Sequence, residues 1–194
     1  MSLADGRERG RALVQWARAR VRQARGGPIA TPPNAAWCAE LGATFVSLRW
    51  RGGELQGCIG TLRPVRSIVS DVAHNAIGAA TRDARGVPLA LADVDELDVE
   101  VSILSPLEPI TAASEAAMRA AIRVGHDGLV LEHADRRATL LPTMWSRLGD
   151  VDTFLAALKR KAGLPRDFWS ADVRMSRYSA EHHVEHAPSK EPPR

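Results

Sequence analysis

Residues 44–60, TFVSLRWRGGELQGCIG, are typical of a β-hairpin, and this hairpin decides the fold class. Residues 44–50 are rich in the aromatic and β-branched side chains that favour strands, and residues 54–59 form the second predicted strand. Between them, Arg51-Gly52-Gly53 supplies glycines, which adopt the positive φ angles that tight hairpin turns require. The hairpin therefore predicts a sheet with antiparallel pairing.

The second strand contains LQGCIG, residues 55–60. Side chains alternate between the two faces of a regular strand, so Leu55 and Ile59 would face the core while Gln56 and Cys58 point the other way. We therefore expect Cys58 to be a reduced, unpaired thiol at the edge of a cleft, where the neighbouring glycines leave room for a ligand. The alternative is that Cys58 is a small buried apolar side chain in tight backbone.

Hydrophobic periodicity outlines the remaining elements. It predicts helices over residues 7–25, 67–83, 114–122 and 151–162, and strands over residues 97–104, 128–133, 137–141 and 173–181. Residues 182–194 are polar and rich in proline, which predicts a flexible tail after a core of residues 7–181. The order of these elements predicts a single α+β domain with a mainly antiparallel sheet flanked by helices.

Composition narrows the class of protein. The chain has 194 residues, of which 45% are hydrophobic and 25% charged, with a formal net charge of +3. It lacks a signal peptide and any apolar run near the ~20 residues of a membrane span, which indicates a cytoplasmic protein. Its two cysteines have no metal-like spacing, and we expect no cofactor and no metal. Only 5% of residues are aromatic, and we expect neither a nucleic acid nor a membrane as partner.

Three further features each allow two interpretations. The arginines of the first helix, Arg7, Arg11, Arg18, Arg22 and Arg25, form either a phosphate-binding strip or, as we favour, a solvated surface. Asn75 lies near the buried stripe of its helix, so its amide must be hydrogen-bonded, either to a loop backbone or to a ligand. His182, His183 and His186 could bind a metal weakly, although histidines in a polar tail are more often simply solvated.

Several motifs together resemble the AMMECR-one domain family, whose prokaryotic members include protein A of the AmmeMemoRadiSam system. They are LQGCIGTLRP (55–64), HNAIGAATRDARGVPL (74–89), DELDVEVSILSPLEPI (95–110), GLVLEHADRRATLLPTMW (128–145) and KAGLPRDFW (161–169). The resemblance runs from about residue 13 to about residue 178. It implies two subdomains around a cleft, and a pathway shared with a Memo-type protein and a radical-SAM protein as possible partners. It implies no firmly assigned activity.

The resemblance and the motifs together define a candidate site. Cys58 is the candidate catalytic residue. The candidate ligand-binding residues are Gln56, Gly57, Gly60, Thr61, Asn75, Asp83, Arg85, Glu100, Ser102 and Lys161. Gln56 stands where the family motif has arginine, and only Asp83 and Arg85 are kept from the family's DPRF motif.

Two functions remain open. In the first, the protein is a non-catalytic module that binds a small ligand or a partner protein near the GCIG motif. In the second, it is a cysteine-dependent enzyme in which backbone N–H groups around Cys58 hold an anion and the thiolate attacks the substrate. Binding is favoured, because no histidine has a compelling place beside Cys58 and a complete catalytic constellation is missing.

Overall fold

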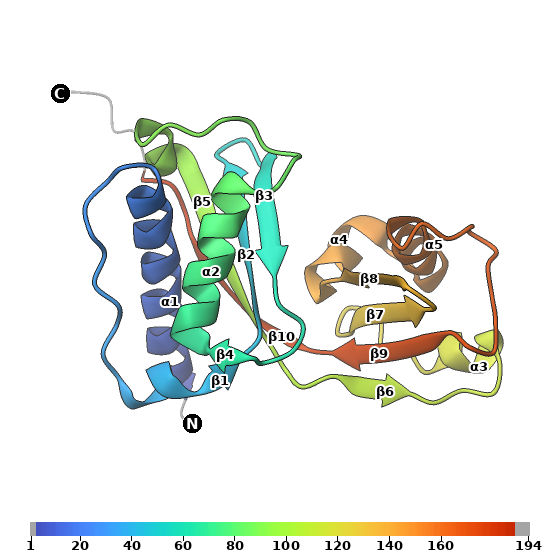
Figure 1. The fold of residues 1–194 in the computed structure, drawn as a ribbon. Coiled ribbons are helices and arrows are strands. Elements are labelled where there is room, and N and C mark those ends of the chain that lie inside the picture. Colours follow the sequence, from blue (N-terminus) through green and yellow to red (C-terminus); the bar gives the residue numbers. More distant parts are fainter. Residues whose placement is uncertain (1–2, 189–194) are drawn as a thin grey trace. The chain divides into compact units, whose positions relative to one another are not determined.

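The computed structural model describes residues 3–188, with side chains from residue 5 onward. Its contacts divide the chain into two compact units. Unit 1 comprises Met1–Leu104 and Glu181–Arg194, and unit 2 comprises Ser105–Ala180, so the second is inserted into the first (Figure 1). Both units combine helices with antiparallel strands, and this confirms the predicted α+β class. No described helix is long and apolar enough to cross a membrane.

Unit 1 is built on a four-stranded sheet with the order β10-β5-β2-β3. Its strands are β2 (Thr44–Trp50), β3 (Leu55–Gly60), β5 (Leu97–Leu104) and β10 (Ala180–Glu185). The helices are α1 (Leu3–Ala24) and α2 (Ile68–Thr81), with 3-10 turns at Ala36–Ala39 and Ala92–Glu96. A short antiparallel ribbon pairs β1 (Leu41–Gly42) with β4 (Arg66–Ser67).

Both helices of unit 1 pack on the same face of the sheet, which we call the helix face (Figure 1). Alternation explains this arrangement, because Val46 and Leu48 of β2 lie opposite Val101 and Val99 of β5 and are fully buried with them. The helix α2 begins as predicted, since the Ser67 hydroxyl accepts a hydrogen bond from the Ser70 N–H at 3.4 Å. The other face, which α1 and α2 do not cover, we call the polar face.

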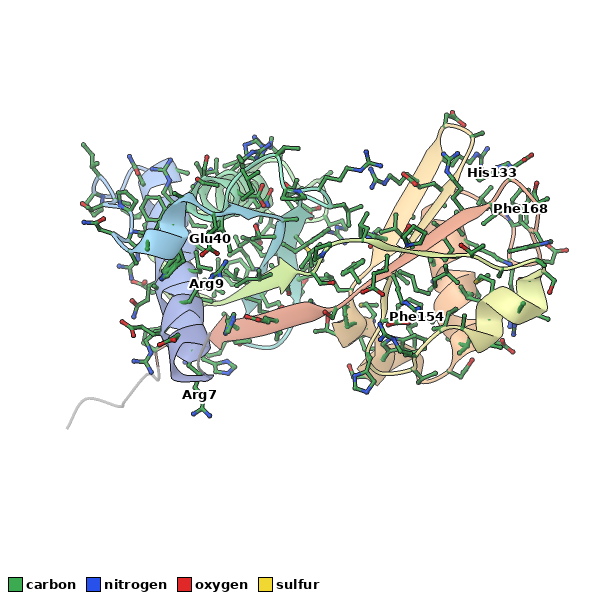
Figure 2. All side chains as sticks on the ribbon, turned by 90° about the horizontal axis from the view of Figure 1, so that it is seen from below. Arg7, Arg9, Glu40, His133, Phe154 and Phe168 are labelled. Carbon is green, nitrogen blue, oxygen red and sulfur yellow. The ribbon has the colours of Figure 1, made fainter. Side chains whose placement is uncertain are left out.

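Unit 2 has its own four-stranded sheet, with the order β6-β9-β7-β8. Its strands are β6 (Glu108–Ile110), β7 (Gly128–His133), β8 (Arg136–Leu140) and β9 (Arg174–Tyr178). The helices are α3 (Glu115–Ala120), α4 (Trp145–Leu148) and α5 (Val151–Lys161), with a 3-10 turn at Pro142–Met144. Phe154, Leu155 and Leu158 of α5 pack on Leu129 and Leu131 of β7 in a separate hydrophobic core (Figure 2).

The end of the chain differs from the prediction. The expected strand 173–181 is two strands, and β10 continues through Glu185 as an edge of the unit 1 sheet. The flexible tail predicted from residue 182 is therefore wrong for residues 182–185, and residues 189–194 lie outside the described part. A strand at a sheet edge has one side in solvent, so its polar composition resembles that of a tail.

Arg18 also departs from the prediction, because it is not on a solvated surface. Only 7% of the residue is exposed, and its guanidinium donates to the carbonyls of Val94 and Leu97 at 2.8 and 2.9 Å and pairs with Glu185. These carbonyls belong to the 3-10 turn before β5 and to the first residue of β5, and they need donors when buried. Arg18 therefore ties α1 to the start of β5 and to β10.

Candidate functional site

A β-bulge decides which residues of β3 face which side. Leu48 pairs with Gly57 and Arg49 pairs with Leu55, so Gln56 is an extra residue in the ladder. Leu55 therefore shares the polar face with Arg49, and the predicted common face of Leu55 and Ile59 is wrong. Gln56 is 2% exposed, receives a hydrogen bond from the Trp50 indole at 3.0 Å and donates to the Val87 carbonyl at 2.7 Å. It is a buried structural amide and does not accompany Cys58.

The strand register arranges the polar face of unit 1 in three rows. The rows are Gly60, Phe45, Ser102; then Cys58, Ser47, Glu100; then Leu55, Arg49, Asp98. Each row crosses β3, β2 and β5 in that order, and neighbouring strands in a sheet lie about 4.8 Å apart. Cys58 and Glu100, at the two ends of the middle row, are therefore separated by roughly 10 Å between their Cα atoms.

Cys58 lies on the polar face as expected, and it is a free, partly exposed cysteine. Its Sγ is 3.1 Å from the Ser47 hydroxyl, which is its hydrogen-bond partner in the described structure. One strand further, Glu100 forms an ion pair with Arg49 at 3.2 Å. We call Cys58, Ser47 and Glu100 the Cys58 row. The Arg49 guanidinium adjoins this row through Glu100, and Ser47 is only 6% exposed.

His182 of β10 also points to the polar face, where its Nδ1 is 3.1 Å from the Ser102 hydroxyl. Burial lowers the pKa of His182, and the nearby Glu100 carboxylate opposes that shift. Three strand spacings separate β10 from β3, or roughly 14 Å. A general base must lie within hydrogen-bond reach of the proton that it removes, so His182 cannot serve Cys58 directly.

The outer edge of β3 is closed by the loop that follows α2. The Asp83 carboxylate accepts a hydrogen bond from the Cys58 N–H at 2.8 Å, and Arg85 bonds the same carboxylate at 2.6 and 2.9 Å. The hydrogen bonds from Arg85 hold the pKa of Asp83 well below its usual range, with burial opposing and the Cys58 N–H adding to the shift. The Cys58 N–H is therefore occupied by the chain's own carboxylate and is not free to hold an anion.

The two glycines of GCIG are needed for packing. A Cβ on Gly57 would lie 2.1 Å from the carbonyl oxygen of Ala79 in α2, and a Cβ on Gly60 would lie 2.2 Å from the Phe45 ring. The room that we expected for a ligand at these glycines is therefore filled by α2 and by Phe45.

Asn75 is buried, as expected, on the helix face. Its amide donates to the Thr44 carbonyl at 2.9 Å and to the Asp71 carboxylate at 3.0 Å, and it also contacts the Thr61 hydroxyl at 3.4 Å. The backbone partner belongs to strand β2 and not to a loop. The same Asp71 carboxylate accepts the N–H and the hydroxyl of Thr44 at 2.9 and 2.7 Å, so this network fastens α2 to the sheet.

The predicted site residues thus fall into separate places. Cys58, Glu100 and Ser102 share the polar face, whereas Thr61 and Asn75 belong to the buried network on the helix face. Lys161 lies in unit 2, where its Nζ donates to the Thr139 carbonyl at 2.9 Å, and its place beside Cys58 stays a prediction. A cleft around Cys58 also stays a prediction. No group of three or more His, Cys, Asp or Glu among the described residues could hold a metal ion.

Ser47, Arg49 and His182 belong to the polar face and were absent from the sequence-based site. Ser47 and Arg49 alternate with Val46 and Leu48 in TFVSLRW, so this alternation was a usable signal. For His182 no comparable signal exists, because its position depends on the pairing of β10 with a strand far away in the sequence.

Comparisons with known proteins agree on one family. The AMMECR1 family model matches residues 14–183. A protein of Methanothermobacter thermautotrophicus is 37% identical over 90% of this chain and 93% of its own length. A Thermotoga maritima protein is 34% identical over 87% of this chain and 94% of its own length. The crystal structure of an uncharacterised protein from Pyrococcus horikoshii superposes with a TM-score of 0.83 at 34% identity, covering 91% of each chain.

Proposed function

This chain belongs to the AMMECR1 family, and we propose that it is a binding module that holds a small polar molecule or a partner protein on the polar face of unit 1. The observation that carries this proposal is the Cys58 row. It places Cys58, Ser47 and Glu100 side by side on three strands, on the face that neither α1 nor α2 covers.

The chemistry of the row indicates the kind of ligand. Glu100 accepts hydrogen bonds, Arg49 donates them, and the Ser47 hydroxyl can do either. Such a surface suits a ligand that carries both donors and acceptors. The strands hold these groups in place. The hydrogen bonds of Asp83 to the Cys58 N–H and to Arg85 fix the edge of β3, so few side chains need to become ordered when a ligand binds.

A cysteine-dependent enzyme is the second candidate, favoured by the partly exposed thiol of Cys58 on the same face. Attack by a thiol needs a base or another means of forming the thiolate. In the part of the chain that the structure describes, the hydrogen-bond partner of the thiol is the Ser47 hydroxyl, and Glu100 lies roughly two strand spacings away. A binding role requires no such base and therefore ranks first.

A pathway shared with Memo-type and radical-SAM proteins is part of the same proposal. Its support is membership of the family, which the matching relatives extend over most of the chain. Purified Memo-type and radical-SAM proteins are therefore the first partner proteins to be mixed with this chain.

The experiment measures alkylation of Cys58 by iodoacetamide in the folded protein, with each cysteine-containing peptide followed by mass spectrometry. Cys38 is the internal control, because it is also free and partly exposed but lies in the 3-10 turn Ala36–Ala39. We expect Cys58 to react without unfolding. We then expect a bound polar metabolite or partner protein to slow the reaction of Cys58 and to leave that of Cys38 unchanged.

A Glu100→Gln and Arg49→Gln double variant tests whether the row itself binds. Protection of Cys58 should disappear in this variant while its basal alkylation rate persists. If Cys58 reacts only after unfolding, the thiol is a buried structural side chain and the proposal fails. Turnover of a protecting compound that stops in Cys58→Ala would establish the enzyme instead.

A further inference from the structure

A basic groove runs between α1 and the edge strand β10 of unit 1, apart from the Cys58 row. It has a volume of about 590 Å³, and its polar lining comes from Arg7, Arg11 and Gln15 of α1 and from His182, His183 and Glu185 of β10. Arg7, Arg11 and Gln15 recur at intervals of four residues, so they share one side of the helix. Figure 2 shows Arg7 near the start of α1, beside β10.

Close packing fixes the two walls of this groove. A Cβ on Gly10 would lie 2.1 Å from Nδ1 of His183, so α1 can approach β10 this closely only with glycine at that position. The His183 ring is therefore held against the backbone of α1 at Gly10, and Gly10 lies between Arg7 and Arg11 in the sequence. Its Nε2 is buried without a hydrogen-bond partner, and the nearest acidic oxygen, on Glu181, is 3.8 Å away.

Protein atoms shield His183 Nε2, so a ligand in the groove would contact the arginines and not this atom. Arg7 and Arg11 have exposed side chains on the same groove, and neither forms an ion pair with a carboxylate among the described residues. Glu185 is the acidic residue of the lining, and Arg18 pairs with it. Its charge is thus compensated within the protein, whereas the charges of Arg7 and Arg11 are not.

We propose that this groove binds the phosphate group of a phosphorylated small molecule. Guanidinium groups match phosphate oxygens in charge and in the geometry of their N–H donors. Arg7 and Arg11 would hold the phosphate, Gln15 would contact the rest of the ligand, and the His183 ring would help to form the wall of the groove. The volume lies within the range of about 300–1,000 Å³ that is usual for small-molecule sites.

Calorimetric titration with inorganic phosphate and with pyrophosphate tests the proposal on the full chain at neutral pH and low salt. We expect saturable binding of pyrophosphate, and weaker binding of phosphate. Arg7→Gln and Arg11→Gln should each raise the Kd about tenfold, as expected for the loss of one charge-assisted contact. Melting without ligand establishes that each variant is folded.

The matched control is the double variant Arg20→Gln and Arg25→Gln, which removes two positive charges from the same end of the chain but outside the groove. Its Kd should stay within about twofold, because screening weakens distant charges. A control variant that is weakened as much as the Arg7→Gln and Arg11→Gln variants would reduce the effect to net charge and overturn the site. Pyrophosphate binding weaker than about 1 mM would also overturn it. Affinity that rises with the length of an added oligonucleotide would assign the surface to nucleic acid instead.

Discussion

The two faces of the unit 1 sheet differ in the side chains that they carry. On the helix face, buried aliphatic side chains surround one polar network, in which the Asp71 carboxylate is bonded by Thr44 and Asn75. On the polar face, thiol, hydroxyl and ionic groups lie in rows that no helix of the unit covers. The same strand residues, taken alternately, therefore serve stability on one side and carry the proposed binding groups on the other. This comparison teaches that polarity alone does not mark a site, because the best-bonded polar groups are structural.

Gly57→Ala should give the largest effect, because it pushes a side chain into the helix face. The added Cβ would meet the backbone oxygen of Ala79, which cannot rotate away. We expect a loss of about 3 kcal/mol in the free energy of unfolding, the upper part of the range for overpacking. Denaturant melts measure it, with Gly52→Ala as control, since a Cβ there meets nothing within 4 Å. Equal stability of the two variants would contradict the close approach of β3 to α2.

Asn75→Ala should come next, at a cost of about 2 kcal/mol, because it removes the buried hydrogen bonds of the Asn75 amide to the Thr44 carbonyl and the Asp71 carboxylate. The comparison is Ser102→Ala, which removes a polar group from the other face of the same sheet. That change should cost less than about 1 kcal/mol, since it removes a single hydrogen bond, the one to His182. If Ser102→Ala lowers the free energy of unfolding more than Asn75→Ala does, the polar face contributes more to stability than the helix face, contrary to our prediction.

Asp83→Asn tests the hydrogen bonds at the outer edge of β3. It should lower the free energy of unfolding by about 1 kcal/mol at neutral pH. The pKa of Asp83 is lowered in the folded state, so the folded protein binds its proton less readily than the unfolded chain does. Its stabilising contribution is therefore complete above the ordinary aspartate pKa of about 4 and is lost as pH falls below that value. Stability of wild type and variant should converge between neutral pH and strongly acidic pH. A constant difference across that range would show that the ionised carboxylate is not what matters.

Cys58→Ala and Cys58→Ser should give the smallest effects, each within about 0.5 kcal/mol, because both change a partly exposed side chain on the polar face. A serine can keep a hydrogen bond to Ser47. If serine destabilises clearly more than alanine, the hydroxyl is buried without a partner, and Cys58 belongs with the structural residues.

Local patterns predicted most of the fold. Strands 44–50 and 97–104 have the predicted bounds because their alternation is regular, and the cap at Ser67 depends on its own helix alone. The burial of Asn75 followed from helical spacing. Features that depend on distant partners were missed. The buried Arg18 guanidinium donates to carbonyls some eighty residues away in the sequence, and β10 is a strand because it pairs with the edge of β5.

The candidate site was predicted less well than the fold. Alternation placed Cys58 on the correct face, yet the bulge at Gln56 moved Leu55 to that face as well. An extra residue in a ladder depends on how two strands pair, which a single strand does not reveal. Asp83 and Arg85 came from the family resemblance, and the structure shows them bonded to each other and to the backbone of Cys58.

The insertion of unit 2 between β5 and β10 has a consequence for how the protein is made. The two ends of unit 2 are joined by hydrogen bonds between Ser105 and Ser179 at 2.9 and 3.0 Å. On the ribosome, α1 is synthesised before unit 2 and β10 after it. A unit with its own core can fold as soon as it has emerged. Arg18 can pair with Glu185 only after β10 has been synthesised, so α1 is among the last elements to reach its final contacts.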